Sequence, residues 1–334
     1  MPTIKDVANM ANVSIATVSR IINGKGGYSE YTKIRVLDAM KELNYQPNNL
    51  AKSLKSNSSQ LIAISVPSVW HPFFSEFVYH AELSLSQHGY NTLVSSNERD
   101  QAKENEFLNM ATRNKVDGII AITYNSINSY LSTDIPFVSI DRYFDRKLYP
   151  KVALVTSDNE AGGRIAFQQL YRRGAKRIAY VGTYAPFNNS AMLRKKGFQE
   201  EAKKSNVLTK IFDLPEGPGA TSLVIAKAID NLSHLDGIFA VNDETALSLI
   251  KFINQTATTI PENLQIVGFD GFNYLQDVPC PISSVKQSAE EMSKAAVKQL
   301  LSLISGKTSL SDVVLPISFR QGQTTRELTG KTFY

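Results

Sequence analysis

Side chains able to do covalent or metal chemistry are few in this sequence, and their spacing fits no familiar site. The one cysteine, Cys280, stands between two prolines without an obvious base partner. Neither a disulfide framework nor a thiolate zinc site is therefore available. No metal-ligand spacing relates the four histidines, His71, His80, His88 and His234. We expect no metal site and no nucleophile.

Nucleotide-binding and hydrolase motifs are also missing. No G-x-G-x-x-G follows a strand-like run, and no G-x-S-x-G is present. Gly306-Lys307-Thr308 imitates the end of a P-loop, but position 301 is Leu where that motif requires Gly. We therefore expect no cofactor and no enzymatic activity.

Charge is concentrated near the N-terminus. The chain of 334 residues has 36 basic and 31 acidic side chains, and residues 1–59 hold eight of the basic and four of the acidic ones. This basic segment suggests a polyanion partner, although a solvated helical surface explains it equally well. No apolar run reaches the roughly 18 residues of a membrane span, and the N-terminus does not resemble a signal peptide. We expect a soluble, cytoplasmic protein.

Residues 1–46 are predicted to form three short helices. Thr3 and Ser14 can cap the first two, and a short turn at Asn12-Val13 separates them, as in a helix-turn-helix. A third helix is predicted from about Ser29 to Leu43. Its expected apolar set is Ile34, Val36, Leu37, Met40 and Leu43. A generic small helical bundle is the alternative, which the short turn and the basic charge disfavour.

The pattern changes from Leu61 onward, after the polar linker at 56–59. Strand-like runs are predicted at 61–66, 92–94, 118–122, 137–140, 152–155, 178–181, 237–241 and 266–269. Continuous apolar strands between amphipathic helices predict parallel sheets covered on both faces, and about 270 residues suffice for two α/β lobes. Ligands of such folds bind beyond the carboxyl ends of the strands or between lobes. We predict domains at 1–46 and 61–334, joined by a segment at 47–60.

Several motifs carry a family resemblance. The head contains TIKDVA, VSIATVSRIIN and LNYQPNNLAKSL, and the body contains VDGII, SIDR, SDN, AVND and IVGFDG. Over essentially its whole length the sequence resembles the lactose-repressor (LacI/GalR) family of transcriptional regulators. The resemblance implies a helix-turn-helix head, a hinge helix and a body of two Rossmann-like lobes similar to periplasmic sugar-binding proteins. It also implies a homodimer on a pseudo-palindromic operator in double-stranded DNA.

The resemblance places the second helix in the major groove, with the positions of Ile15 and Ala16 reading bases. Both side chains are apolar and can pack only on a thymine methyl, whereas Arg20 can bind a guanine bidentately. Packing of Ile15 on the first helix and a phosphate contact by Arg20 are the alternatives. The expected DNA-binding residues of the head are Ser14, Ile15, Ala16, Thr17, Arg20, Asn23 and Tyr45.

Leu50 to Lys55 looks like the hinge helix of the family. Leu50 and Leu54 lie one turn apart, and a helix this short is not stable alone in water. The resemblance implies that two such helices of a dimer pair in the minor groove. Leu54 would then wedge into the central base step, with Lys55 beside it. A plain linker is the alternative.

Matching to the family also marks effector-binding residues near strand ends and helix starts, namely Phe73, Asp141, Ser190, Arg194, Asn242 and Asp270. Their acceptors and donors suit the hydroxyls of a sugar. Alternatively, Asn242 caps the following helix, Asp270 pairs structurally and Phe73 belongs to the core. A sugar phosphate would favour a second cation in the cleft, for which Arg142 and Lys195 are available, and a nucleobase would favour more aromatic rings.

These observations predict a sequence-specific DNA-binding repressor of a carbohydrate-utilisation operon. A sugar or sugar derivative would release it from its operator through differential affinity for two conformations. The alternative is a global regulator of the same family that takes a phosphorylated carrier protein as corepressor. A sugar-transport component is a third interpretation, which the basic head disfavours.

Overall fold

The structure is a computed structural model that describes residues 2–46, 58–131, 134–145, 147–187, 190–275, 278–307 and 310–328. The chain divides into two compact units, residues 1–59 and 60–334, called here the head and the body. Each is considered by itself. The predicted hinge residues Leu50, Leu54 and Lys55 lie outside the described residues.

The head is a helix-turn-helix followed by a third helix. Its helices are α1 (Ile4–Met10), α2 (Ile15–Ile22) and α3 (Glu30–Glu42). Ser14 caps α2, because its hydroxyl accepts a hydrogen bond from the Thr17 N–H at 3.2 Å. Asn12, in the turn, has a left-handed backbone with φ 47°. The buried side chains are Val7, Ala8, Ala11, Val18, Ile21, Val36 and Ala39. The three predicted helices are confirmed.

The predicted apolar set of α3 is partly wrong. Ile34 and Leu37 are 53% and 47% exposed, whereas Val36 and Ala39 are buried. A core this small accepts only one narrow stripe of α3. Ile34 and Leu37 lie about 100° or more around the helix from that stripe and therefore face away from α1 and α2.

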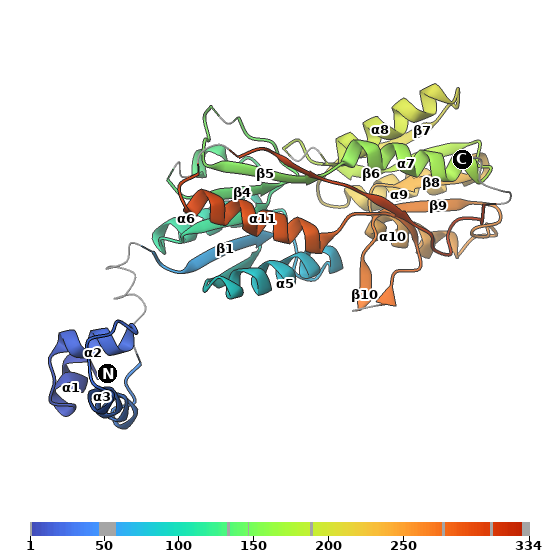
Figure 1. Ribbon diagram of the computed structural model, residues 1–334. Coiled ribbons are helices and arrows are strands. Elements are labelled where there is room, and N and C mark those ends of the chain that lie inside the picture. Colours follow the sequence, from blue (N-terminus) through green and yellow to red (C-terminus); the bar gives the residue numbers. More distant parts are fainter. Residues whose placement is uncertain are drawn as a thin grey trace. The chain divides into compact units, whose positions relative to one another are not determined.

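The body contains two sheets, each of six described strands (Figure 1). The first is parallel and runs in the order β13 (Val313–Leu315), β5 (Val152–Ser157), β4 (Phe137–Ile140), β3 (Gly118–Ile122), β1 (Leu61–Val66), β2 (Asn91–Ser96). The second runs in the order β14 (Ser318–Arg320), β12 (Ser283–Lys286), β9 (Gln265–Asp270), β8 (Gly237–Ala240), β6 (Ile178–Tyr184), β7 (Lys210–Pro215). Only the pairing of β14 with β12 is antiparallel among these.

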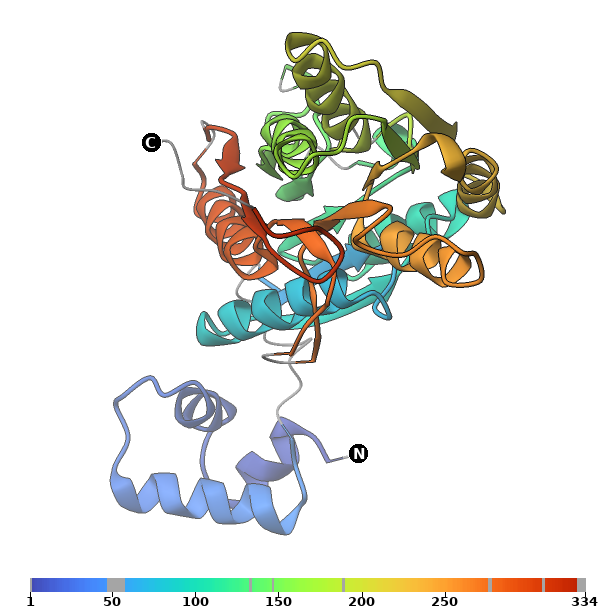
Figure 2. The ribbon, with the colours of Figure 1, turned by 90° about the vertical axis from the view of Figure 1, so that its right-hand side faces the viewer.

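Helices flank both sheets and define two lobes. The first lobe has α5 (Pro72–Gln87), α6 (Gln101–Arg113) and α11 (Ala289–Ile304), and α5 and α11 lie side by side (Figure 2). The second lobe has α7 (Asn159–Arg172), α8 (Ser190–Lys204), α9 (Ala220–Ile229) and α10 (Asp243–Ile253). A small hairpin, β10 (Asn273–Leu275) and β11 (Val278–Pro279), follows β9. None of the described helices has the length and apolarity needed to cross a membrane.

All eight predicted strand runs lie within strands or extend one residue past their ends, and three match end to end. The sequence pattern missed others. β7 is a half-exposed edge strand, and β13 and β14 have only three residues each. β12 has the sequence SSVK. Its Ser283 is buried, and the Ser283 hydroxyl is hydrogen-bonded to the Thr325 hydroxyl at 2.7 Å. A buried strand rich in serine carries no hydrophobic signal.

The chain crosses between the lobes three times. It passes from β5 to α7, from β12 to α11 and from β13 to β14. Each lobe is therefore built from non-contiguous segments, and the short crossings at 158, 287–288 and 316–317 are the covalent links between them. Such paired connections are the usual site of hinge motion in two-lobed proteins.

Two glycines bring α7 and α8 into close contact. A Cβ on Gly163 would lie 1.9 Å from the Arg194 carbonyl oxygen, and a Cβ on Gly197 would lie 1.9 Å from the Glu160 carbonyl oxygen. No side chain fits at either position. The crossing holds the N-terminal half of α8 against the first turns of α7, so the side chains of Arg194 and Asn159 meet.

Replacing Gly163 should destabilise the body. We expect Gly163→Ala to lower the free energy of unfolding by about 1–3 kcal/mol or more, because the backbones must separate. Gly217→Ala is the control, since a Cβ at Gly217 meets no heavy atom within 4 Å. Urea denaturation followed by circular dichroism measures both. Equal midpoints for the two variants would contradict the close helix crossing.

Candidate functional site

The surface of α2 presents most of the residues expected to contact DNA. Ile15 is 43% exposed, so packing on α1 does not take up its side chain, and Ala16 and Arg20 are exposed as well. Ser14 is also exposed, and its hydroxyl lies 2.9 Å from the Thr17 hydroxyl. These side chains form a small surface that begins at the start of α2 and extends to Arg20 in its last turn, and a base edge or a phosphate can contact it.

Two other expected DNA-binding residues have structural contacts of their own. The Asn23 side chain donates a hydrogen bond to the Ser19 carbonyl at 2.7 Å, at the C-terminal end of α2. Tyr45 is half-buried against the head core. Both side chains thus support the head in addition to any DNA contact.

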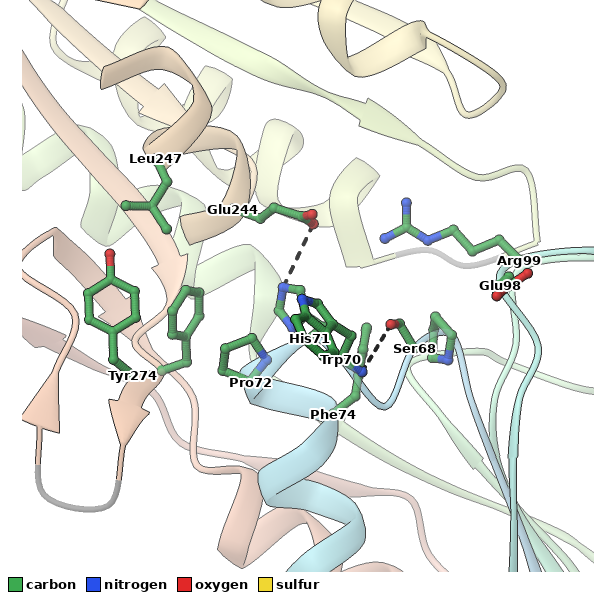
Figure 3. Close-up of a pocket in the computed structure, with 12 residues that line it drawn as sticks. Ser68, Trp70, His71, Pro72, Phe74, Glu98, Arg99, Glu244, Leu247 and Tyr274 are labelled. Carbon is green, nitrogen blue, oxygen red and sulfur yellow. Dashed lines mark hydrogen bonds and ion pairs between the residues drawn. The ribbon is translucent and has the colours of Figure 1, made fainter. Parts of the chain in front are cut away.

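A cleft between the two lobes contains three adjoining cavities. The inner cavity, of about 40 Å³, has five of the six expected effector residues, Phe73, Asp141, Arg194, Asn242 and Asp270, in its lining. A side cavity of about 190 Å³ and a mouth of about 470 Å³ share Arg99 with it. Figure 3 shows the mouth, with residues of the first lobe opposite Glu244 and Leu247 of α10. Side chains from both lobes therefore line each of the three cavities.

A chain of hydrogen bonds links the lobes beneath the inner cavity. The Asn159 amide donates to Asp141 Oδ1 at 3.2 Å, and its oxygen accepts from Arg194 Nε at 2.8 Å. Asp141 Oδ1 also accepts from the Thr156 hydroxyl at 2.6 Å. Arg194 Nη1 donates to the Val241 carbonyl at 2.9 Å, and the guanidinium lies over the Phe269 ring. This chain fixes the direction in which Asp141 and Arg194 face the cavity.

Both expected carboxylate residues lie at strand ends and have a left-handed backbone conformation. Asp141 comes directly after β4 with φ 59°, and Asp270 ends β9 with φ 106°. Non-glycine residues adopt this region rarely and at a cost in conformational energy. Such strain concentrates at ligand-binding sites, because there the side chain must be aimed away from the direction of the strand.

The second carboxylate is held by two cleft residues. Asp270 Oδ1 accepts from Gln287 Nε2 at 2.8 Å and lies 3.8 Å from Arg194 Nη1. Burial raises the pKa of Asp270, and Arg194 opposes that rise. The Gln287 Oε1 and His71 Nδ1 atoms are buried without a hydrogen-bond partner among the described residues. Both residues line the inner cavity, so polar groups of a ligand would complete their hydrogen bonding.

Two polar contacts join the lobes at the rim of the cleft. His71 Nε2, in the first lobe, lies 3.8 Å from a carboxylate oxygen of Glu244 in the second (Figure 3). Arg99 Nη1 lies 3.4 Å from Glu216 Oε1, and its guanidinium also lies over the Tyr124 ring. These contacts form only when the lobes are close together.

The outcome for the expected effector residues is uneven. Asn242 lines the inner cavity and also caps α10, since its oxygen accepts from the Thr245 N–H at 2.8 Å. Phe73 lines the same cavity as a buried member of the core. Ser190 is buried at the start of α8 and does not line any of the three cavities, although its neighbour Ala191 lines the side cavity. Asn242 therefore both caps a helix and lines the cleft, and Phe73 both belongs to the core and lines the cleft.

The sequence interpretation missed several residues that line the cleft, Trp70, His71, Arg99, Tyr124, Glu216, Glu244 and Gln287. It also missed Asn159, which lies behind the lining and is hydrogen-bonded to Asp141 and Arg194. A signal was present for some of them. Trp70, Arg99 and Tyr124 each follow a predicted parallel strand within a few residues, and the carboxyl ends of such strands are where ligands bind. Asn159 and Gln287 lie at the crossings between lobes, which the sequence pattern does not reveal.

A helix-turn-helix head with an exposed second helix, followed by a two-lobed α/β body with a polar cleft, defines the class of ligand-responsive DNA-binding regulators. Residues 3–48 match the model for bacterial regulatory proteins of the lacI family, and residues 167–325 match a periplasmic binding protein-like domain. Two curated relatives extend these matches to nearly the full length.

The sucrose operon repressor of Streptococcus mutans is 34% identical over 95% of this chain and 98% of its own length. The ribose operon repressor of Bacillus subtilis is 32% identical over 98% of this chain and 99% of its own. The fold is similar to the lac repressor dimer bound to operator and the anti-inducer ONPF, with a TM-score of 0.81 and 22% identity over 97% of this chain and 99% of that one. The chain belongs to the LacI family of transcriptional repressors.

Asp243 introduces a pH dependence beneath the cleft. It is fully buried, Oδ1 accepts from the Ser284 hydroxyl at 2.6 Å, and Oδ2 accepts from the Gly271 N–H at 2.9 Å. Burial, followed by the nearby charge of Asp270, raises the pKa of Asp243 to about 8. Because the folded pKa exceeds the ordinary value of 3.8, the folded state binds the proton more tightly. This contribution to stability is complete below pH 4 and is lost as the pH rises towards 8.

Asp243→Asn should remove this dependence, because the amide imitates the protonated acid. We expect the stability of the variant relative to the parent to increase between pH 5 and pH 8, by at most about 1.4 kcal/mol per pH unit. Urea denaturation at each pH measures the difference. Asp230→Asn, at the C-terminus of α9, is the control. A difference that stays constant over this pH range would show that Asp243 is ionised throughout.

Proposed function

We propose that this protein represses a carbohydrate-utilisation operon in the cytoplasm and that a sugar or sugar derivative in the inter-lobe cleft releases it from its operator. The observation that carries the proposal is that acidic, amide and guanidinium groups of both lobes converge on one cavity in the body. The same chain carries an exposed helix-turn-helix surface. The names of the sucrose and ribose operon repressors support a carbohydrate operon.

Operator recognition is assigned to α2. Ile15 and Ala16 are exposed and can pack on thymine methyls, while Arg20 supplies the fork of donors that matches guanine O6 and N7. The basic charge of residues 1–59 supplies the sequence-independent attraction to phosphates. Leu54 and Lys55 are proposed as hinge contacts in the minor groove on sequence resemblance alone.

A homodimer is proposed because one head reads only a few base pairs and a pseudo-palindromic operator doubles the contacts. The body has exposed apolar side chains able to form the interface. They include Tyr79 and Leu83 on α5, and Leu275 and Val278 on the β10–β11 hairpin, which α5 contacts. A monomer exposing this surface to water would lose the free energy that burial supplies.

Release follows from binding across the lobes. A sugar that contacts Asp141 of the first lobe and Arg194, Asn242 and Asp270 of the second favours one relative placement of the lobes. If the operator-bound dimer prefers another placement of the lobes, binding of the sugar weakens binding of the operator. The coupling free energy between two such sites is typically about 1–3 kcal/mol. The three short crossings leave the lobes free to change their relative placement.

The role of Arg20 is tested by two substitutions. We expect both Arg20→Ala and Arg20→Lys to weaken operator binding by about 1–3 kcal/mol, roughly 5- to 150-fold, because neither keeps the bidentate fork. Only Arg20→Ala should also weaken binding to random DNA. Fluorescence anisotropy at fixed salt, on an operator selected from random duplexes, measures both. Lys41→Ala, at the end of α3, is the control. Wild-type operator affinity in Arg20→Lys would instead assign Arg20 to a phosphate.

The effector is identified by release of the selected operator in the presence of sugars, sugar phosphates and purines. We expect one sugar to release the operator, and Arg194→Ala to abolish release while operator binding persists. Lys196→Ala is the control, because Lys196 lies on the same helix but is exposed and pairs with Glu160 at 2.9 Å.

A second outcome is informative for the alternative regulator. If no sugar releases the operator, and a phosphorylated carrier protein tightens operator binding, the sugar-responsive function is wrong. The protein is then a global regulator of the same family.

A thermal unfolding scan of Arg194→Ala confirms that the variant is folded, so that loss of response is not loss of structure.

A further inference from the structure

Trp70 stands at the mouth of the cleft with its indole in solvent. It is the one tryptophan of the sequence, and it is 93% exposed, whereas tryptophan is usually largely buried. Its loop is nevertheless held firmly. The Trp70 N–H donates to the Ser68 hydroxyl at 3.1 Å (Figure 3), and the Ser75 hydroxyl donates to the Val69 carbonyl at 2.6 Å. An ordered loop therefore presents a bare aromatic face to the cavity.

The mouth has the composition of a sugar subsite. Its volume of about 470 Å³ lies within the range of small-molecule sites, which is about 300–1,000 Å³. Aromatic rings from both lobes line it, those of Trp70, Phe74, Phe272 and Tyr274. Among them lie hydrogen-bonding groups of Ser68, Glu98, Arg99 and Glu244. Apolar ring faces with polar groups at their edges match a sugar, which has C–H faces and a rim of hydroxyls.

The mouth and the inner cavity adjoin each other. His71, Phe74 and Arg99 line both. The inner cavity alone is about 40 Å³, yet it contains the converging groups Asp141, Arg194 and Asp270. A ligand held by those groups therefore extends outward past His71 towards Trp70. We expect two linked rings to occupy the inner part and the mouth together, and a single ring to occupy one of them.

The charge of the cleft disfavours an anionic ligand. Its carboxylates are Asp141, Glu216, Glu244 and Asp270, and also Glu98, which is already paired with Lys103. Its two arginines are already near acidic partners, Arg99 with Glu216 at 3.4 Å and Arg194 with Asp270 at 3.8 Å. A phosphate would meet more negative than positive charge here.

The two other cations considered from the sequence do not line the three cavities of the cleft. Arg142 donates hydrogen bonds to the Thr123 hydroxyl at 3.1 Å and to the Asn128 side chain at 2.9 Å within the first lobe. Lys195 is paired with Asp213 in the second lobe. Neither supplies a phosphate contact in the cleft.

We propose that the mouth is a second sugar subsite organised by Trp70, and that the effector is an uncharged disaccharide. One ring lies in the inner part of the cleft against Asp141, Arg194 and Asp270, and the other stacks on Trp70. This inference rests on the proposed sugar response and specifies the size and charge of the ligand. Trp70 determines specificity, because it contacts only a ligand with a second ring.

The test uses Trp70 as its own reporter, since all tryptophan emission comes from this residue. The full chain is titrated with sucrose, maltose, cellobiose and trehalose, with glucose, fructose and ribose, and with sucrose 6-phosphate, by calorimetry and by tryptophan fluorescence. We expect one disaccharide to bind at least about tenfold more tightly than its component monosaccharides. It should also shift the emission to shorter wavelength, because the second ring removes water from the indole.

Substitutions of Trp70 test whether its indole ring provides the extra affinity for the disaccharide. Trp70→Ala should weaken disaccharide binding about tenfold, to near the monosaccharide level, while monosaccharide binding changes less than about twofold. Trp70→Phe should restore most of the loss, because it keeps an aromatic face. Tyr31→Ala is the control, an exposed aromatic residue of the head.

The possible failures are distinguishable. Equal affinity for monosaccharides and disaccharides, unaffected by Trp70→Ala, overturns the second subsite and leaves the sugar response standing. Tighter binding of sucrose 6-phosphate than of sucrose overturns the proposal that the ligand is uncharged. If no sugar of either size binds while operator binding persists, the proposed sugar response itself is wrong.

Discussion

The arrangement of the cleft depends on the side chain of Asn159. This residue begins α7 directly after the first crossing between the lobes, and its amide both donates to Asp141 and accepts from Arg194. A carboxylate of one lobe and a guanidinium of the other are thus oriented by one neutral group. Because every polar atom of that group is used, a change in the relative placement of the lobes disturbs both ligand-facing charges together.

Close packing makes this contact possible. The α7–α8 crossing through Gly163 and Gly197 places Arg194 beside Asn159 without side chains between the helices. On the opposite side, the buried carboxyl of Asp243 holds the backbone after β9, where Asp270 adopts its left-handed conformation. The cleft is therefore polar at its surface and rigidly supported beneath, the combination that lets small ligands bias the placement of whole lobes.

The head and the body each have a separate hydrophobic core. The head core is small, so most of α2 remains available for contact with DNA. The body has three clusters of buried apolar side chains, and one of them contains residues of both lobes. The lobes therefore share apolar packing as well as three short connections and the polar contacts at the cleft rim. A change in the relative placement of the lobes therefore alters apolar contacts as well as polar ones.

Much of this molecule follows from the sequence alone. Helical spacing and the Ser14 cap determined the helix-turn-helix, and continuous apolar runs determined the parallel strands, because local periodicity and capping act between near neighbours. The motifs around Asp141, Arg194 and Asp270 marked a cleft. Only the tertiary structure decided that Ser190 lies outside the cavities and that Trp70 reaches the mouth. Those outcomes depend on how distant segments cross and pack, which no local pattern contains.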